Sequence, residues 1–157
     1  MLLFMPLLSY AATKEQAVKA GIVYNITKYV IWPSTVADDD QFNLCIFGDA
    51  QLGNVLKSLQ GKLVDNKPLV LHRWVKSDSS ERCHMVFVAK DSTQEFQDFL
   101  QEINSLPVLT ISDIPDFVNA GGMIGLIKDG TRVGFEVNLM TVRAAGLGMS
   151  AQLLKLA

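Results

Sequence analysis

The chain has 157 residues, of which 49% are hydrophobic. A chain of this length can bury one core and is too short for two ordinary domains, so we expect a single domain. Its 14 basic and 16 acidic residues give a formal net charge of -2. The protein therefore has no excess of positive charge that would attract it to nucleic acid, and any partner must be bound through a local surface.

Residues 1–11 form an uncharged apolar leader, in which Ser9 and Ala11 fit the -3 and -1 positions of a cleavage site. This pattern predicts a signal peptide and an exported domain over residues 12–157. The first basic residue is Lys14, so the leader lacks the positively charged residues with which a signal peptide usually begins. We expect that this sequence is truncated or that its true start lies upstream. The alternative, a short membrane anchor, is disfavoured because a span needs about 20 apolar residues.

The hydrophobic periodicity predicts alternating helices and strands downstream of the leader. A near-3.6 period predicts a first helix over residues 14–31, which Trp32 and Pro33 end, followed by a loop over 34–41. We expect strands over residues 42–48, 67–75, 83–89, 107–112, 123–128 and 131–138, and helices over residues 52–59, 93–103, 115–119 and 139–157. The nearly apolar run 83–89 is typical of a central strand covered on both faces.

This alternation predicts an α/β fold: a mostly parallel sheet of five or six strands, flanked by helices on both faces. The pair Asp129-Gly130 predicts a C-terminal β-hairpin, after which Asn138 is placed to cap one final, uninterrupted helix. The turn G-D-A-Q-L-G after the first long strand lacks the G-x-G-x-x-G spacing, so dinucleotide binding is not expected.

The residues that could perform chemistry are few. In an exported protein, Cys45 and Cys83 are most simply a disulfide, whereas two buried free thiols are the alternative. His72 and His84 both lie within expected strands, and we expect His84 to be a core or edge histidine with a satisfied hydrogen bond. The sequence has no zinc-binding motif and no G-x-S-x-G nucleophile elbow. We therefore expect that the protein binds no metal or cofactor and is not an enzyme.

One polar constellation stands out near the C-terminus. Alternation places Arg132, Glu136 and Asn138 on one face of the last strand, and Arg143 follows one helical turn later. One interpretation is a surface salt bridge with a helix cap. The other is a polar pocket or docking surface, to which the aromatic Trp32 could add a hot spot.

From the first helix to its last residue, the chain resembles the YfiR family through an ordered series of motifs. The series is V-K-A-G-I-V-Y-N-I-T-K-Y-V-I-W-P, L-C-I-F-G-D, G-K, C-H-M-V-F-V, L-T-I-S-D, G-G-M-I-G-L, R-V-G-F-E-V-N-L and A-A-G-L-G-M-S-A-Q-L-L-K-L-A. No single motif is catalytic, and the order and spacing of the series make the resemblance specific.

The resemblance implies a periplasmic, non-catalytic inhibitor. Such proteins bind the periplasmic region of an inner-membrane diguanylate cyclase of the YfiN type, which lowers cyclic di-GMP and biofilm formation. The family's cysteine pair matches Cys45 and Cys83 and implies redox sensitivity, while a second pair found in some members has no counterpart here.

The resemblance also allows an outer-membrane lipoprotein partner and a homodimer. We expect the docking surface to include Trp32, Glu136, Asn138 and Arg143. The alternative function is a periplasmic small-molecule receptor or accessory protein that uses the same corner as its pocket.

Overall fold

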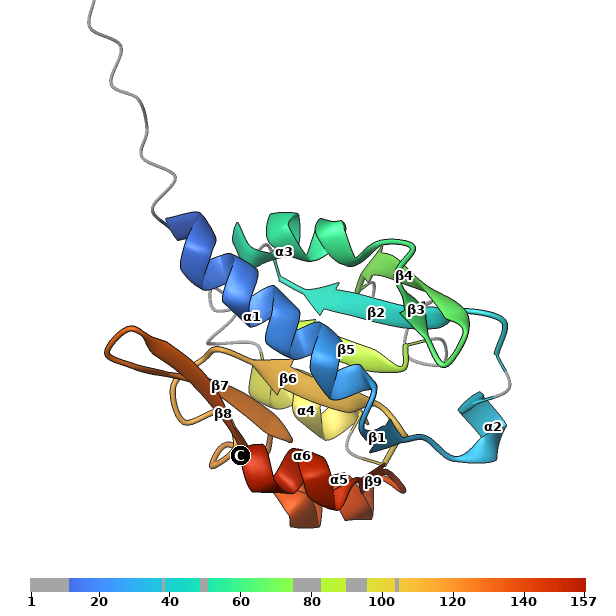
Figure 1. Ribbon diagram of the computed structural model, residues 1–157. Helices are drawn as coiled ribbons and strands as arrows, with labels where there is room; N and C mark the ends of the chain where they lie inside the picture. The colour runs from blue at the N-terminus through green and yellow to red at the C-terminus, as the bar shows by residue number, and fades with distance from the viewer. Residues whose placement is uncertain (1–11, 38, 49–50, 75–82, 90–95, 104) are drawn as a thin grey trace, which may run out of the picture.

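The computed structural model describes residues 12–37, 39–48, 51–74, 83–89, 96–103 and 105–157 (Figure 1). The strands are β1 (Val30–Ile31), β2 (Phe42–Phe47), β3 (Leu63–Val64), β4 (Lys67–Arg73), β5 (Met85–Val88), β6 (Leu109–Ser112), β7 (Ile124–Asp129), β8 (Arg132–Val137) and β9 (Gly148–Met149). The helices are α1 (Ala12–Thr27), α2 (Ser34–Ala37), α3 (Gln51–Leu56), the 3-10 helix η1 (Lys57–Leu59), α4 (Phe96–Ile103), α5 (Leu139–Ala144) and α6 (Ala151–Leu156). The predicted leader, residues 1–11, lies outside the described residues.

Seven strands form the main sheet, in the order β3-β4-β2-β5-β6-β7-β8. The four central pairings are parallel, whereas β3 with β4 and β7 with β8 are antiparallel. The sheet is therefore mixed, and the expectation of a mostly parallel sheet of five or six strands is wrong. β3 was not predicted because it has only two residues. It is followed by a tight turn at Asp65 and Asn66, whose φ angles are positive, 49° and 65°.

The five parallel strands follow the chain order 2-1-3-4-5, because β2 lies between β4 and β5, and β6 and β7 follow on the β5 side. This is the order of flavodoxin-like doubly wound sheets. All five carboxyl ends lie at one edge of the sheet and all five amino ends at the other. The fold therefore has two distinct edges at which loops can build a site.

Each face of the sheet carries its own apolar cluster. Along β5, Met85 and Phe87 join one cluster, and Val86 and Val88 join the other. All four side chains are fully buried, as the apolar run predicts. α1 packs into the first cluster and α4 into the second, so burial of both faces holds the layers together.

The first helix is shorter than its periodicity predicts. α1 ends at Thr27 instead of Ile31. The residues beyond it form β1, which pairs antiparallel with β9, so that Val30 lies opposite Met149. The apolar periodicity continues to residue 31, but its last members pair with a strand near the other end of the chain. A local sequence pattern cannot show such a distant pairing.

Two short elements also differ from expectation. The segment expected to be a loop over residues 34–41 contains α2. The helix expected over residues 115–119 is a series of turns, in which Asp116 has a positive φ of 59°. That backbone conformation is not helical and is uncommon for a residue other than glycine.

The C-terminal hairpin and its cap are confirmed, but the final helix is interrupted. β7 and β8 pair antiparallel around Gly130, whose φ is 61°, and the Thr141 N–H donates to Asn138 Oδ1 at 3.2 Å. The expected continuous helix over 139–157 divides into α5, β9 and α6. Gly146 follows α5 with a φ of 80°. A residue in this left-handed conformation commonly terminates a helix, which explains why the helix does not continue. Ser150 then caps α6.

Candidate functional site: an aromatic pocket beside the disulfide

The predicted disulfide is confirmed. Cys45 in β2 and Cys83, just before β5, are bridged across neighbouring strands with a Cα–Cα distance of 5.9 Å. Both residues are buried within the second apolar cluster. The bridge thus joins the two strands at the centre of the sheet, and it fixes the chain on the N-terminal side of His84.

His84 is buried and fully hydrogen-bonded, as expected for a core histidine. Its Nδ1 accepts the backbone N–H of Asn43 at 2.9 Å. Its Nε2 faces the Val36 carbonyl at 3.0 Å and the Asp39 carboxylate at 3.2 Å. Because Nδ1 accepts from a backbone donor, this geometry selects the tautomer that carries its proton on Nε2.

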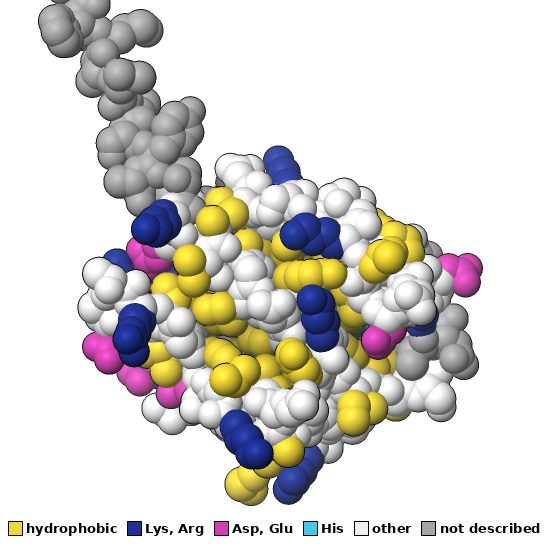
Figure 2. Space-filling view, viewed as in Figure 1, with side chains coloured by type: hydrophobic (Ala, Val, Ile, Leu, Met, Phe, Trp, Pro, Cys, Tyr) yellow, Lys and Arg dark blue, Asp and Glu magenta, His cyan; other side chains and the backbone are white. Residues whose placement is uncertain are grey.

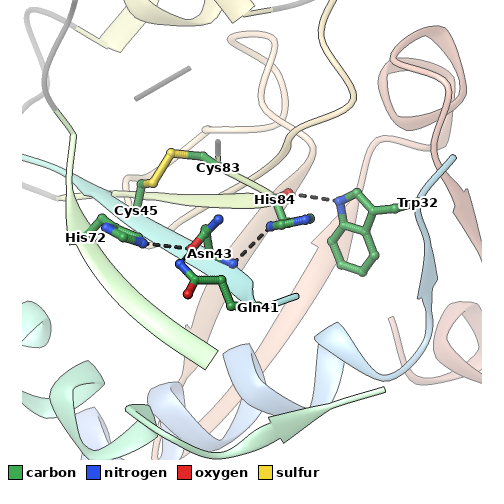
Figure 3. Close-up of a disulfide and its surroundings, with 7 residues drawn as sticks. All are labelled: Trp32, Gln41, Asn43, Cys45, His72, Cys83 and His84. Atoms are coloured by element: carbon green, nitrogen blue, oxygen red, sulfur yellow. Dashed lines mark hydrogen bonds between the residues drawn. A yellow bond between two sulfur atoms is a disulfide. The ribbon is translucent and has the colours of Figure 1, made fainter. Parts of the chain in front are cut away.

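Trp32 is tied to the same residue (Figure 3). Its indole Nε1 donates to the His84 carbonyl at 2.9 Å. Its ring packs edge-on against Phe42, with 5.1 Å between ring centroids, and Phe42 in turn stacks on the His84 ring. Trp32 is therefore held by the residue that directly follows a disulfide cysteine.

These residues line an open pocket of about 520 Å³, here called the Trp32 pocket. Its lining consists of Lys28, Val30, Ile31, Trp32, Val36, Gln41, Phe42, Val64, Asp65, Lys67 and His84. Phe42 begins β2 and His84 precedes β5. The Trp32 pocket therefore lies at the amino ends of the parallel strands.

The surface around this pocket combines apolar and basic groups. Ile31 is 65% exposed although it is a large apolar residue. Lys28 and Lys62 place their ammonium groups 4.6 and 5.2 Å from the ring centroid of Tyr24. Figure 2 shows apolar side chains lying between lysine and arginine side chains across the face that carries α1. Such a surface suits a partner with apolar and acidic groups.

The structure does not gather the four predicted docking residues into one site. Glu136 lines a second pocket, Asn138 caps α5, and Arg143 is exposed on that helix. Trp32 lines the first pocket instead. Trp32 and Glu136 therefore lie in separate pockets.

Sequence reasoning also missed the residues around Glu136. Lys19 on α1 pairs with Asp113, the residue after β6, at 3.1 Å, and with Glu15 at 3.4 Å. The four-residue spacing of Glu15 and Lys19 on a helix was a signal that could have revealed half of this network. The contact with Asp113 depends on the tertiary fold and had no local signal.

Among the described residues, no helix is both long and apolar enough to cross a membrane. Within the same part of the chain, no group of three or more His, Cys, Asp or Glu side chains could hold a metal ion.

A disulfide-bridged α/β fold with an exposed apolar pocket is typical of a binding protein. The family model described as YfiR/HmsC-like matches residues 16–157. The chain belongs to this family, which confirms the resemblance read from the motifs. The family is one of regulatory, non-catalytic periplasmic proteins that act in diguanylate cyclase signalling.

Proposed function

We propose that this protein is exported to the periplasm, where it binds the periplasmic region of an inner-membrane diguanylate cyclase of the YfiN type and holds that enzyme inactive. It acts without catalysis and lowers cyclic di-GMP and biofilm formation. Family membership supports this function, and the buried disulfide fits an oxidising compartment.

The main support for a docking surface at this pocket is that an exposed apolar residue, Ile31, directly precedes an aromatic residue, Trp32, that is held in place. Ile31 offers apolar area to a partner, while Trp32 is fixed by its hydrogen bond to His84 and its contact with Phe42. Hot spots in protein interfaces are enriched in such fixed aromatic groups. We therefore place the cyclase contact at the Trp32 pocket, with Lys28 and Lys67 at its rim.

The disulfide gives this docking surface a route to redox control. Reduction frees Cys83 from Cys45 and loosens the backbone that carries the His84 carbonyl, the acceptor for Trp32. Release of the cyclase requires that the bound conformation tolerates this loosening less well than the free one.

The other predicted contacts stay proposals. We propose that Glu136 on β8, Asn138 after it and Arg143 on α5 contribute to contacts with an outer-membrane lipoprotein or a second copy of the chain. Separate mutation of these residues and of the Trp32 pocket, as described in the Discussion for Arg143, distinguishes the two sets of contacts.

The function is tested by measuring cyclic di-GMP in a deletion strain. The strain is complemented either with the chain behind a working signal peptide or with residues 12–157 kept in the cytoplasm. We expect deletion to raise cyclic di-GMP and only the exported form to restore it. No change on deletion, with a candidate cyclase shown to be expressed, contradicts the proposal.

The docking surface is tested with a matched pair of variants. Ile31→Asp introduces a charge at the Trp32 pocket, and Leu156→Asp does so on α6 at a similar exposure, 70% against 65%. We expect Ile31→Asp to raise cyclic di-GMP towards the deletion level and Leu156→Asp to restore inhibition. Equal effects of the two variants would place the interface elsewhere.

A further inference from the structure

The main sheet ends in a long strand with a free edge. β8 pairs with β7 along one side, and no other described strand lies along its other side. β8 has six residues, whereas β3 at the opposite end of the sheet has only two. The free N–H and C=O groups of such an edge can pair with a strand of another chain.

The register identifies the backbone groups that are free. The Asn138 N–H donates to the Met123 carbonyl at 2.8 Å, so these residues, which continue the register of β7 and β8, form a hydrogen-bonded pair. Hydrogen-bonded and non-hydrogen-bonded pairs alternate along an antiparallel ladder. Three residues of β8 therefore turn their backbone N–H and C=O groups away from β7: Val133, Phe135 and Val137. None of these groups forms a hydrogen bond with the described residues.

The outer part of this edge is accessible. β7 pairs with β6 only through Ile124 and Gly125, so the rest of the β7–β8 hairpin projects beyond the parallel strands (Figure 1). Arg132 and Gly134 are exposed, and a Cβ on Gly134 would meet no atom within 4 Å. The middle of β8 is therefore open to solvent, where another chain can reach it.

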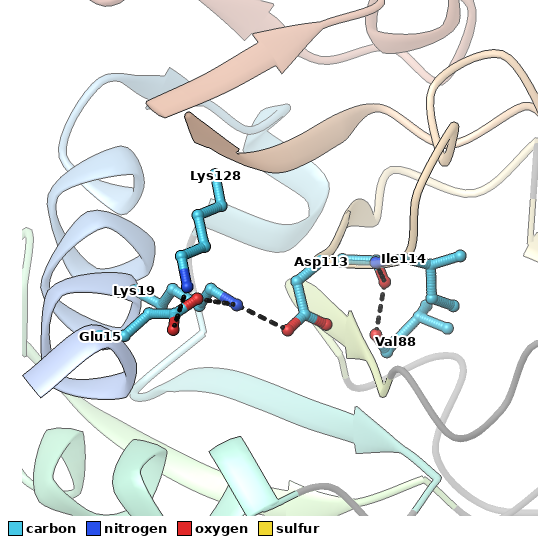
Figure 4. A network of polar contacts seen from close by, with 7 residues as sticks. Glu15, Lys19, Val88, Asp113, Ile114 and Lys128 are labelled. Atoms are coloured by element: carbon cyan, nitrogen blue, oxygen red, sulfur yellow. Dashed lines mark hydrogen bonds and ion pairs between the residues drawn. The ribbon is translucent and has the colours of Figure 1, made fainter. Parts of the chain in front are cut away.

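The hairpin is held in place although it projects (Figure 4). Lys128 Nζ on β7 lies 3.1 Å from Glu15 Oε2 on α1. Lys19 Nζ on the same helix lies 3.4 Å from Glu15 Oε1 and 3.1 Å from Asp113 Oδ2. The hairpin is thus tied through α1 to the end of β6. An edge that is already ordered loses little conformational entropy when it pairs with another strand.

The sequence of β8 is complementary to itself when two copies are antiparallel. A two-fold axis at Gly134 places Arg132 of each copy directly opposite Glu136 of the other, because both residues lie two positions from the axis. It also places Val133 opposite Phe135, so that their free N–H and C=O groups can bond to one another. Opposite charges and aromatic–β-branched pairs at such positions stabilise a sheet.

Other registers lack this charge pairing. With the axis at Phe135, Glu136 lies opposite Gly134, and with the axis at Val133, Arg132 lies opposite Gly134. An axis between two residues sets a residue with free backbone groups opposite one that is already bonded to β7, so the ladder cannot form. The charges of β8 therefore favour the register centred on Gly134, with a second copy of the chain as the occupant of the edge.

We propose that β8 pairs antiparallel with β8 of a second copy of this chain, with the two-fold axis at Gly134. The pairing joins two seven-stranded sheets into one continuous sheet. The assembly ends at the dimer, because a two-fold contact uses the same edge of both copies. The inference gives the second-copy contact proposed for Glu136 a defined geometry. It goes beyond inhibition of a cyclase and does not depend on it, since both sides of the contact come from this chain.

Sedimentation equilibrium of the purified full chain over a wide range of concentrations, together with amide hydrogen exchange, tests the pairing. We expect a monomer–dimer equilibrium, in which the Val133 and Phe135 N–H groups exchange more slowly as the dimer forms. Arg132→Glu sets like charges opposite each other and should weaken the dimer about tenfold, equivalent to about 1.4 kcal/mol. Arg132→Glu combined with Glu136→Arg reverses both charges and should restore the dimer.

Lys57→Glu provides the matched control, because it reverses one positive charge at an exposed position on η1. We expect this variant to dimerise like the natural chain. A chain that remains monomeric, a dimer without slower exchange at Val133 and Phe135, an equal loss in Lys57→Glu, or no rescue by the double variant would each overturn the proposal. Because no cyclase is present, such a result leaves the inhibitory function standing.

Discussion

The indole Nε1 of Trp32 donates a hydrogen bond to the backbone carbonyl of His84, with a distance of 2.9 Å between the two atoms. The same carbonyl accepts the N–H of Leu109 at the start of β6. His84 directly follows Cys83 of the disulfide. A single residue therefore connects the covalent bridge, the central sheet and the aromatic group proposed to contact the cyclase.

Removal of the disulfide should destabilise the protein and alter the environment of Trp32. The bridge closes a loop of 38 positions, for which the chain-entropy model gives about 4 kcal/mol of stabilisation. We expect the Cys45→Ala, Cys83→Ala double variant to lose up to about this much in urea unfolding. In a Trp74→Phe background, Trp32 emission should also change on reduction under native conditions. An unchanged emission would argue against coupling of the bridge to Trp32.

Replacement of His84 should depend on whether the new side chain supplies an acceptor. His84→Phe leaves the buried Asn43 N–H without its partner, which costs about 1–3 kcal/mol. His84→Asn can place an oxygen near the position of Nδ1 and should retain part of that stability. Thermal melts of both variants check this expectation, and an equal loss in both would assign the role of His84 to packing alone.

Gly122→Ala should be strongly destabilising. A Cβ at this position would collide with the ring of Phe117, which is fully buried, and overpacking of a core costs about 1–3 kcal/mol. Gly134→Ala is the control, since its Cβ would have no neighbour within 4 Å. Denaturant midpoints of the two variants make the comparison. Similar midpoints would show that the Phe117 ring can move aside.

Acid should weaken the contacts between α1 and the hairpin. The pKa of Glu15 is lowered below its ordinary value of 4.5, first by the hydrogen bond from Lys128 and then by Lys19. A lowered folded-state pKa means that the contribution is present above the unfolded pKa and is lost as the pH falls through the folded value. Glu15→Gln should therefore flatten the acid side of the stability profile, measured as melting temperature against pH. An unchanged acid slope in Glu15→Gln would contradict this expectation.

Substitutions of Asn138 and Arg143 should have different effects, because Asn138 has a structural role and Arg143 is a candidate contact residue. Asn138→Ala removes the cap of α5 and should cost about 1 kcal/mol. Arg143 is exposed, so Arg143→Glu should change stability by no more than about 0.5 kcal/mol. If Arg143 contributes to docking, that variant raises cyclic di-GMP although its melt is unchanged. Full inhibition by Arg143→Glu would restrict the docking surface to the Trp32 pocket.

Several features could be predicted from the sequence because they depend on local or repeating patterns. The apolar run over residues 83–89 predicted a strand buried on both faces, and Asp129-Gly130 predicted the hairpin. Asn138 was recognised as a cap because capping involves only neighbouring residues. The pair of cysteines in a chain predicted to be exported indicated the bridge, and the ordered motifs identified the family.

The contacts between segments far apart in the chain could not be predicted in this way. The end of the first predicted helix became β1 because β9 pairs with it. The two-residue β3, which the sequence pattern did not predict, adds an antiparallel strand next to β4. Lys19 meets Asp113 and Trp32 meets His84 through packing of elements far apart in the chain. Such contacts depend on the relative placement of whole elements, and no local sequence period encodes that placement.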